Sequence, residues 1–243
     1  GFGRGRSGHL DVLRAWCSRS GVSLTTYLER LRDAGLKTLP GTAAEILDDE
    51  VRATLCPDKI SSQEWLDVHE AAHSVGLRSN VTIMFGSIEH PASWVRHMSV
   101  TRDLQDRTSG FTEFVPLPFV HMATPIYLRG RSRKGPTFRE TLLVHAIARI
   151  AYRGLIDNIQ LSWVKIGPDG SRQLLQAGCN DVGGTLMDEN ISRAAGASHG
   201  QGMTRDDFLS LVEPIGRSLR QRTTTYGRVD GTTRGDESVL TMA

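Results

Sequence analysis

The chain has 243 residues, of which 39% are hydrophobic, and its 29 basic side chains stand against 27 acidic ones. This composition is typical of a globular protein with one large or two small domains, and it excludes a disordered chain. The near balance of charge gives no reason to expect nucleic acid as a partner, because such proteins cluster basic residues on one face. No apolar run reaches the roughly 18 residues of a membrane span, so we expect no membrane segment.

The N-terminal stretch differs from the rest of the chain. Residues 1–20 are rich in arginine and glycine, lack the apolar core of a signal peptide and show only a weak helical pattern in LDVLRAWCSRS. The chain begins with Gly1 rather than methionine, which indicates a fragment. Its three cysteines, Cys17, Cys56 and Cys179, form no CxxC pair and no disulfide framework, so we expect a cytoplasmic protein.

From Ser23 onward the signals for helices and strands are clear. SLTTYLERLRDAG predicts a helix with Ser23 as its N-cap and Gly35 at its end. LKTLPG predicts a short strand, and TAAEILDDEVRATLC a helix that breaks near its acids. Ser61 or Ser62 caps a strong helix in SSQEWLDVHEAAHSVGL. NVTIMFG, residues 80–86, predicts a buried parallel strand.

The second half of the chain continues this alternation. HPASWVRHMSVTRDLQDRT predicts a helix and FTEFVPLPFV a strand. The polar loop at 124–137 contains the basic run RGRSRKG, which we interpret as a solvated loop, with a lid over an anionic substrate as the alternative. RETLLVHAIARIAYRG predicts a helix, IDNIQLSWVKIG a strand and TRDDFLSLVEPIGRSLRQRT a last helix, before a loose tail at 228–243.

The order of these elements predicts an α/β fold with a parallel sheet. Strands begin near residues 36, 80, 111 and 157, with a short one near 178, and helices lie between them. The chain has neither GxGxxG nor GxxxxGK[ST], so a Rossmann or P-loop fold is not supported. A (β/α) TIM-type barrel fits better, because polar residues follow the strands. About five strands are found where a barrel needs about eight, so we expect about three βα units to be missing at the N-terminus.

Several motifs in this order closely resemble one family of enzymes. They are AGLKTLPGTAAEILDDEVR, GFTEFVPLPFVH, QLSWVKIG, GCNDVGGTLMDENISRAAG and RQRTTTYG. They are similar to radical S-adenosylmethionine (SAM) enzymes that build deazaflavin cofactors, in the CofH-type half of FO synthase. The resemblance covers about residues 21–227 and does not extend to residues 1–20, for which a frameshift or a misjoined start is our hypothesis.

The resemblance implies a fold, a reaction and cofactors. The fold is a radical SAM barrel, and the reaction joins the hydroxybenzyl unit of L-tyrosine to 5-amino-6-(D-ribitylamino)uracil. The cofactors are SAM and a 4Fe–4S cluster that a CxxxCxxC motif binds. A CofG-type module, fused or separate, is the implied partner. This chain contains no CxxxCxxC, so we expect the C-terminal part of a longer enzyme whose missing segment holds the cluster ligands.

The same resemblance suggests which residues bind SAM. Glu45 follows a predicted strand and would contact SAM, with a first-turn helix acid as the alternative. Arg78 would grip the SAM carboxylate, although its position before a strand points to the opposite face of the barrel. Glu113 is expected to face inward with a charge partner. The helical histidines His69, His73 and His97 are expected at the surface, and their spacing is not that of a zinc HExxH motif.

The predicted substrate contacts lie near the ends of later strands. His121 and Ser162 are candidates, with loop bonding as the alternative for the histidine. The richest segment is NDVGGTLMDENIS, in which the adjacent glycines would let backbone N–H groups approach a polar substrate. Asp188 and Glu189 are expected to start a helix instead. The candidates in this segment are Asn180, Asp181, Gly183, Gly184 and Thr185.

Two other functions stay open at this point. The chain could belong to the related radical SAM enzymes of the futalosine route to menaquinone, although TEFVPLPF and GGTLMDE favour the deazaflavin side. It could also be an inactive truncated product.

Overall fold

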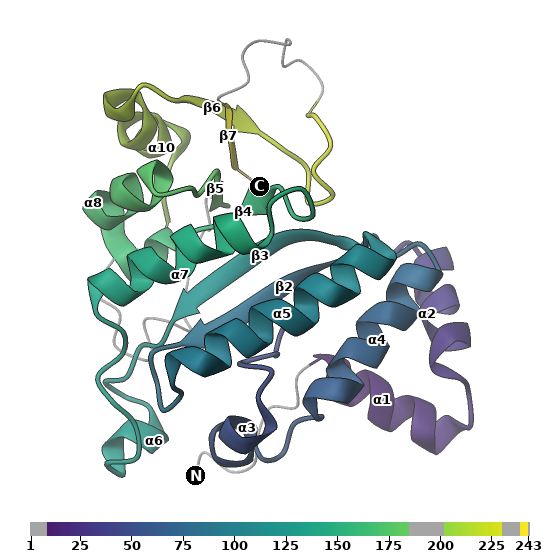
Figure 1. Ribbon diagram of the computed structural model, residues 1–243. Helices are drawn as coiled ribbons and strands as arrows, with labels where there is room; N and C mark the ends of the chain where they lie inside the picture. Colours follow the sequence, from purple (N-terminus) through teal and green to yellow (C-terminus); the bar gives the residue numbers. More distant parts are fainter. Residues whose placement is uncertain (1–8, 185–201, 230–238, 243) are drawn as a thin grey trace.

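The computed structural model describes residues 9–184, 202–229 and 239–242. Its centre is a parallel sheet in the order β1 (Thr38–Leu39), β2 (Arg78–Phe85), β3 (Phe111–Pro118) and β4 (Asn158–Ile159) (Figure 1). A second parallel sheet has the order β5 (Asp181–Gly183), β7 (Val239–Met242) and β6 (Ser218–Gln221). A parallel bridge between Gln160 and Asp181 joins the two sheets.

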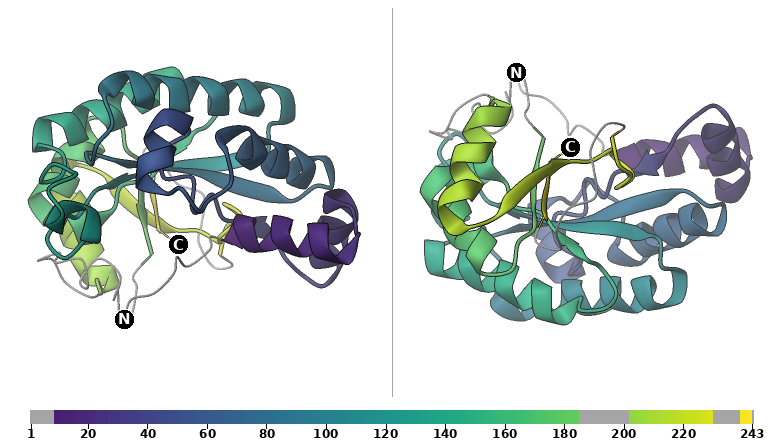
Figure 2. Two further views of the ribbon diagram at one scale, coloured as in Figure 1. Left: turned by 90° about the horizontal axis from the view of Figure 1, so that it is seen from below. Right: turned by 90° about the horizontal axis from the view of Figure 1, so that it is seen from above.

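The helices follow one another along the outside of the strands. Figure 2 shows α2 (Leu24–Asp33), α4 (Ser62–Ser74), α5 (Pro91–Thr108) and α7 (Phe138–Ala151) in sequence around the curved sheet. The series continues with α8 (Trp163–Gln176) and α10 (Arg205–Val212), and each helix contacts the next. The remaining elements are α1 (His9–Ser20), α3 (Asp49–Leu55), α6 (Pro125–Leu128) and the 3-10 helix η1 (Glu213–Ile215).

This arrangement confirms the predicted α/β fold with a parallel sheet. The outer ring of helices around a curved sheet is compatible with part of a TIM-type barrel. A complete radical SAM barrel stays a prediction. In the part of the chain that the structure describes, every helix is too short or too polar to cross a membrane.

Local signals in the sequence explain where the helices begin. Ser61 accepts a hydrogen bond from the Glu64 amide at 3.2 Å, and the Glu64 carboxylate accepts one from the Ser61 amide at 2.9 Å. Thr137 and Glu140 form the same capping box at the start of α7, and α5 begins at Pro91. These caps satisfy N–H groups that the first helical turn leaves without partners, so the predicted helix starts are confirmed.

Two predicted elements are wrong in the second half of the chain. The strand predicted at 156–167 is limited to β4, because α8 begins at Trp163 and kinks at Gly167, next to Pro168. The last predicted helix ends at Val212, because Pro214 and a left-handed Gly216 stop it, and β6 follows.

The segments near both chain termini contain described elements. Within the arginine- and glycine-rich stretch 1–20, Leu10 and Leu13 of α1 lie in the main hydrophobic core. At the other end, β7 occupies part of the tail predicted to be loose, and residues 230–238 and 243 lie outside the described residues.

The helix-facing side of the sheet forms the core and contains the histidines. The large side chains Trp65, Phe85, Phe114 and Tyr152 are fully buried there. The predicted surface location of the helical histidines is wrong, because alternate strand residues face the helices and enclose these rings. His69 and His97 are fully buried, and His73 is partly buried against Ser79 and Thr108.

Candidate functional site

The inner face of the sheet, opposite the helices, carries a group of polar side chains. Successive side chains of a strand point to opposite faces of the sheet. Ser79 and Phe114 contact residues of the outer helices, so the adjacent Asn80 and Glu113 point to the inner face. They are joined there by residues from three later segments. We call this set the inner polar cluster, and it consists of Asn80, Glu113, Gln160, Asp181, Arg222 and Tyr226.

The centre of the inner polar cluster is two carboxylates around one arginine. Arg222 donates from Nε and Nη2 to Asp181 Oδ2 at 2.8 and 2.7 Å, and its Nη2 lies 3.4 Å from Glu113 Oε2. All three side chains are buried, with Asp181 fully so. The Arg222 guanidinium also lies 3.9 Å over the Tyr226 ring. Glu113 was predicted to face inward with a charge partner, and this is confirmed.

Tyr226 connects the two carboxylates through a single hydroxyl. Its oxygen lies 2.7 Å from Glu113 Oε2 and also contacts Asp181 Oδ2 at short range. Burial and the two nearby carboxylates raise the pKa of Tyr226 well above its usual value. The phenol therefore stays protonated at neutral pH and serves as a hydrogen-bond donor.

Amide side chains complete the inner polar cluster. Gln160 donates to Glu113 Oε2 at 2.8 Å, and Asn80 donates to Glu113 Oε1 at 3.0 Å. Asn80 also accepts from the Gly41 amide at 2.6 Å, which links the end of β1 to the cluster. A Cβ atom at Gly41 would come within 2.3 Å of the Asn80 carbonyl oxygen, so this approach requires glycine. The cluster thus links β2, β3 and β5 with the segments that follow β1, β4 and β6 through polar contacts.

Three predicted substrate residues gather at the C-terminal ends of β4 and β5. Ser162 directly precedes α8, and its half-buried side chain makes no cap hydrogen bond. Gly183 ends β5 with φ of 70°, and the Gly184 carbonyl accepts from Trp163 Nε1 at 3.1 Å. The Gly183 amide donates to Asp181 Oδ1 at 2.8 Å, so that N–H group is used within the protein. Thr185, Asp188 and Glu189 lie outside the described residues.

The prediction that Asn180 and Asp181 lie at the C-terminal end of a strand is wrong. Asp181 begins β5 and Asn180 precedes it. The Asn180 side chain accepts from the Ile159 amide at 2.9 Å and from Arg149 Nη2 at 2.7 Å, so it ties β5 to β4. Asp181 belongs to the inner polar cluster. The placement error arose because the buried segment before Asn180 belongs to α8, not to a strand.

The other predicted residues lie apart from each other. Glu45 follows β1 and forms an ion pair with Lys59 at 2.6 Å, and both side chains are mostly buried. His121 follows β3 and packs against Tyr127, with ring centroids 4.5 Å apart. Arg78 is exposed at the N-terminal end of β2 and donates to the Ser109 carbonyl. That end of a parallel sheet is opposite the strand ends where ligands bind, which gives no support to the predicted SAM contact.

Sequence reasoning missed Arg222 and Tyr226, the two residues that complete the inner polar cluster. Both belong to RQRTTTYG, a motif that carried the family resemblance. The predicted final helix covers residues 204–223, so it includes Arg222 and gives it no inward direction, and Tyr226 lies beyond its end. The sequence does contain a signal for an earlier helix end, because Pro214 and Gly216 are residues that stop a helix.

The described residues do not fit an iron–sulfur cluster. Cys17 lies on α1, Cys56 follows α3 and Cys179 precedes β5, so the three thiols come from separate elements. Burial raises the pKa of the Cys179 thiol well above its usual value, which disfavours the thiolate that a metal needs. In the three described ranges, His, Cys, Asp and Glu side chains form no group of three that could hold a metal ion.

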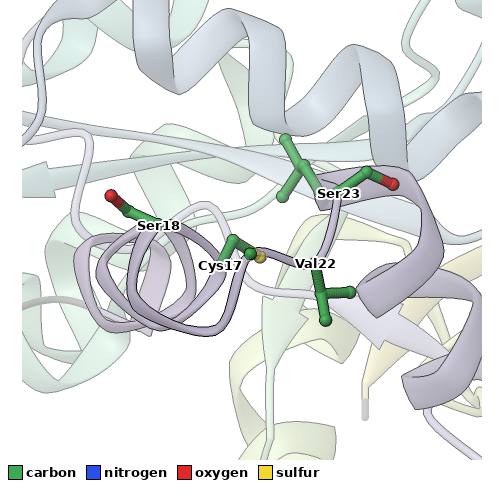
Figure 3. A pocket seen from close by; sticks show the side chains of 6 residues that line it. Cys17, Ser18, Val22 and Ser23 are labelled. Atoms are coloured by element: carbon green, nitrogen blue, oxygen red, sulfur yellow. The ribbon is translucent and has the colours of Figure 1, made fainter.

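A cavity of about 490 Å³ lies at the turn between α1 and α2 (Figure 3). It is lined by Cys17, Ser18, Gly21, Val22, Ser23 and Leu24. None of these residues belongs to the inner polar cluster or to the predicted contacts.

Comparisons with known proteins agree with the resemblance of the motifs. The FO synthase of Nocardia farcinica is 55% identical over 213 residues, which is 88% of this chain and 25% of that protein. The FO synthase of Mycobacterium leprae is 53% identical over 209 residues, or 86% of this chain and 24% of that protein.

A shorter relative shows the same similarity. The 5-amino-6-(D-ribitylamino)uracil–L-tyrosine 4-hydroxyphenyl transferase of Methanothermobacter thermautotrophicus is 49% identical over 209 residues, or 86% of this chain and 57% of that protein. This chain thus spans about a quarter of the length of the two FO synthases and little more than half of the transferase. The family profile described as the CofH/MqnC C-terminal region matches residues 108–232, and this chain belongs to that family.

Proposed function

We propose that this chain is the C-terminal part of a radical SAM transferase of FO biosynthesis. The observation that carries the proposal is the similarity to the transferase of M. thermautotrophicus, 49% identical over 86% of this chain. The reaction would join the hydroxybenzyl unit of L-tyrosine to 5-amino-6-(D-ribitylamino)uracil. The named relatives are FO synthases and this transferase, so the futalosine route and an inactive product are not favoured.

The described residues would contribute substrate binding rather than the iron–sulfur cluster. A parallel sheet binds ligands beyond its C-terminal strand ends, where His121, Ser162 and Gly184 lie. SAM and the cluster would be held by other parts of a longer enzyme, with Glu45 as this chain's candidate SAM contact. The difference in length between the FO synthases and the transferase supports a further module, which we propose to be of CofG type.

A chimeric enzyme tests this function directly. The matching region of the M. thermautotrophicus transferase, 209 aligned residues, would be replaced by the corresponding residues of this chain. The chimera would be reconstituted with iron and sulfide without oxygen and supplied with SAM, tyrosine and the ribityluracil. We expect the joined product by mass spectrometry, because the exchanged regions supply the same substrate contacts.

Two variants of the chimera test the site. Ser162→Ala and His121→Gln should raise the KM for one of the two substrates, whereas Asp103→Asn, an exposed change on α5, should leave it unchanged. A folded chimera with a full cluster and no product would contradict the proposed function.

A further inference from the structure

The Tyr226 hydroxyl makes two contacts with carboxyl oxygens in the inner polar cluster, but it carries only one hydrogen atom. The Tyr226 oxygen lies within hydrogen-bond distance of both Glu113 Oε2 and Asp181 Oδ2. A phenol carries one hydrogen and can donate it to one carboxylate at a time. If both carboxyl groups were ionised, one of these two contacts would join two oxygen atoms with no hydrogen between them. A proton on either carboxyl group turns that group into a donor to the Tyr226 oxygen and satisfies both contacts.

The charge balance leads to the same conclusion. Glu113 and Asp181 together carry two negative charges when ionised, and Arg222 supplies one positive charge, so the buried set would have a net charge of −1. The other direct contacts come from neutral groups, which are Asn80, Gln160, Tyr226 and the Gly183 amide. A buried unpaired charge is costly, and two carboxyl groups that share a site usually keep one proton between them.

The neighbouring groups point the same way. Burial raises the pKa of Asp181, and the charge of Glu113 adds to this rise while Arg222 opposes it. Near Asp181, the Cys179 thiol is neutral at pH 7 because burial raises its pKa. Arg217 and Arg149 lie beside Cys179, where they donate to the Cys179 and Gly178 carbonyl groups rather than to Asp181.

We propose that Glu113, Asp181 and Tyr226 form a proton-holding site on the inner face of the sheet, with one proton shared by the two carboxyl groups. Tyr226 is its half-buried member, whereas both carboxyl groups are buried.

Infrared spectroscopy of the full chain tests the shared proton. At pH 7 the wild-type protein should show the absorption of one protonated carboxyl group, with the shift in D2O that marks an exchangeable proton. Glu113→Gln and Asp181→Asn should each abolish this signal, because Arg222 then balances the single remaining carboxylate. Asp48→Asn is the matched control: Asp48 is also buried, but it pairs one-to-one with Arg96 at 2.7 Å, so its loss should leave the signal unchanged.

Tyr226→Phe tests the hydroxyl itself. Its removal should shift the frequency of the carboxyl signal, because the protonated group loses its hydrogen-bond acceptor. If the wild-type protein shows no protonated carboxyl group at pH 7, the proposal is overturned, and this measurement needs no variant to fold. A carboxyl signal that persists in both single carboxyl variants, or an unchanged frequency in Tyr226→Phe, would also overturn it.

Discussion

At the scale of single residues, Arg222 is the side chain that balances the buried negative charge of the inner polar cluster. It is the cation that contacts both Glu113 and Asp181, and it is almost completely buried. Buried ion pairs of this kind contribute little net stability when complete, but they become costly when one partner is removed. The reason is that the remaining charge cannot return to water.

Replacement of this arginine should therefore destabilise the protein strongly. We expect Arg222→Met to lower the free energy of unfolding by about 3–5 kcal/mol at pH 7, because two buried carboxyl groups lose their cation. Urea denaturation followed by circular dichroism measures the change. Arg220→Met, on β6 two residues before Arg222 and partly exposed, is the control and should change stability by less than about 1 kcal/mol. Equal losses in the two variants would contradict this role for Arg222.

At the scale of elements, the start of α7 shows how a short motif fixes a helix. Thr137 Oγ1 accepts from the Glu140 amide at 3.2 Å, and the Glu140 carboxylate accepts from the Thr137 amide at 2.7 Å. The same carboxylate pairs with Arg133 at 2.7 Å. These contacts, with the Arg133 amide donating to the Ser87 carbonyl at 3.0 Å, fix the basic loop against the C-terminal end of β2.

The cap at Thr137 gives a prediction about this helix. Thr137→Ala should lower the free energy of unfolding by about 1 kcal/mol, because the first turn of α7 loses its side-chain acceptor. Thermal and urea denaturation measure the loss. Ser99→Ala changes an exposed serine inside α5 and should cost no stability, since alanine is the better helix former. If the two variants behave alike, the capping box does not stabilise α7.

At the scale of the whole molecule, buried histidines lie between the sheet and its outer helices. His69, His97 and His145 are fully buried on α4, α5 and α7, and each has an Nε2 atom without a hydrogen-bond partner. Burial lowers the pKa of His97 to about 3 and the pKa values of His73 and His145 to about 4. These rings are therefore neutral in the folded protein at pH 7.

The neutral histidines should make the fold sensitive to acid. Their pKa values are lower in the folded chain than in the unfolded one, so the unfolded chain binds more protons below pH 6.5. The free energy of unfolding should thus fall as the pH drops from about 6.5 to about 4. His145→Leu should make this fall shallower, by on the order of 3 kcal/mol across the range.

The matched control for this pH dependence is His90→Asn. His90 is exposed and caps α5 through Nδ1, and asparagine preserves the cap. Its variant should keep the wild-type slope in denaturation series measured from pH 4 to pH 7. A wild-type slope in His145→Leu would show that this histidine is not the source.

Much of the fold could be predicted because its signals are local. The starts of α2, α4 and α7 follow from a capping residue and the pattern of the next turn, and β2 and β3 follow from dense β-branched and apolar runs. Prediction failed at α8 and β6. The segment QLSWVKIG is apolar enough for a strand, and only packing against α7 and α10 makes most of it helical.

The sequence by itself determined the class of fold, the family and the inward direction of Glu113, because each depends on residues close together in the chain. Only the tertiary structure decided which residues form the inner polar cluster and which histidines are buried. Tyr226 lies 113 positions from the Glu113 that it contacts, and such a pair leaves no periodic pattern to read. The structure also separated Asn180, which ties β5 to β4, from Asp181, whose carboxyl group faces Arg222 and Tyr226.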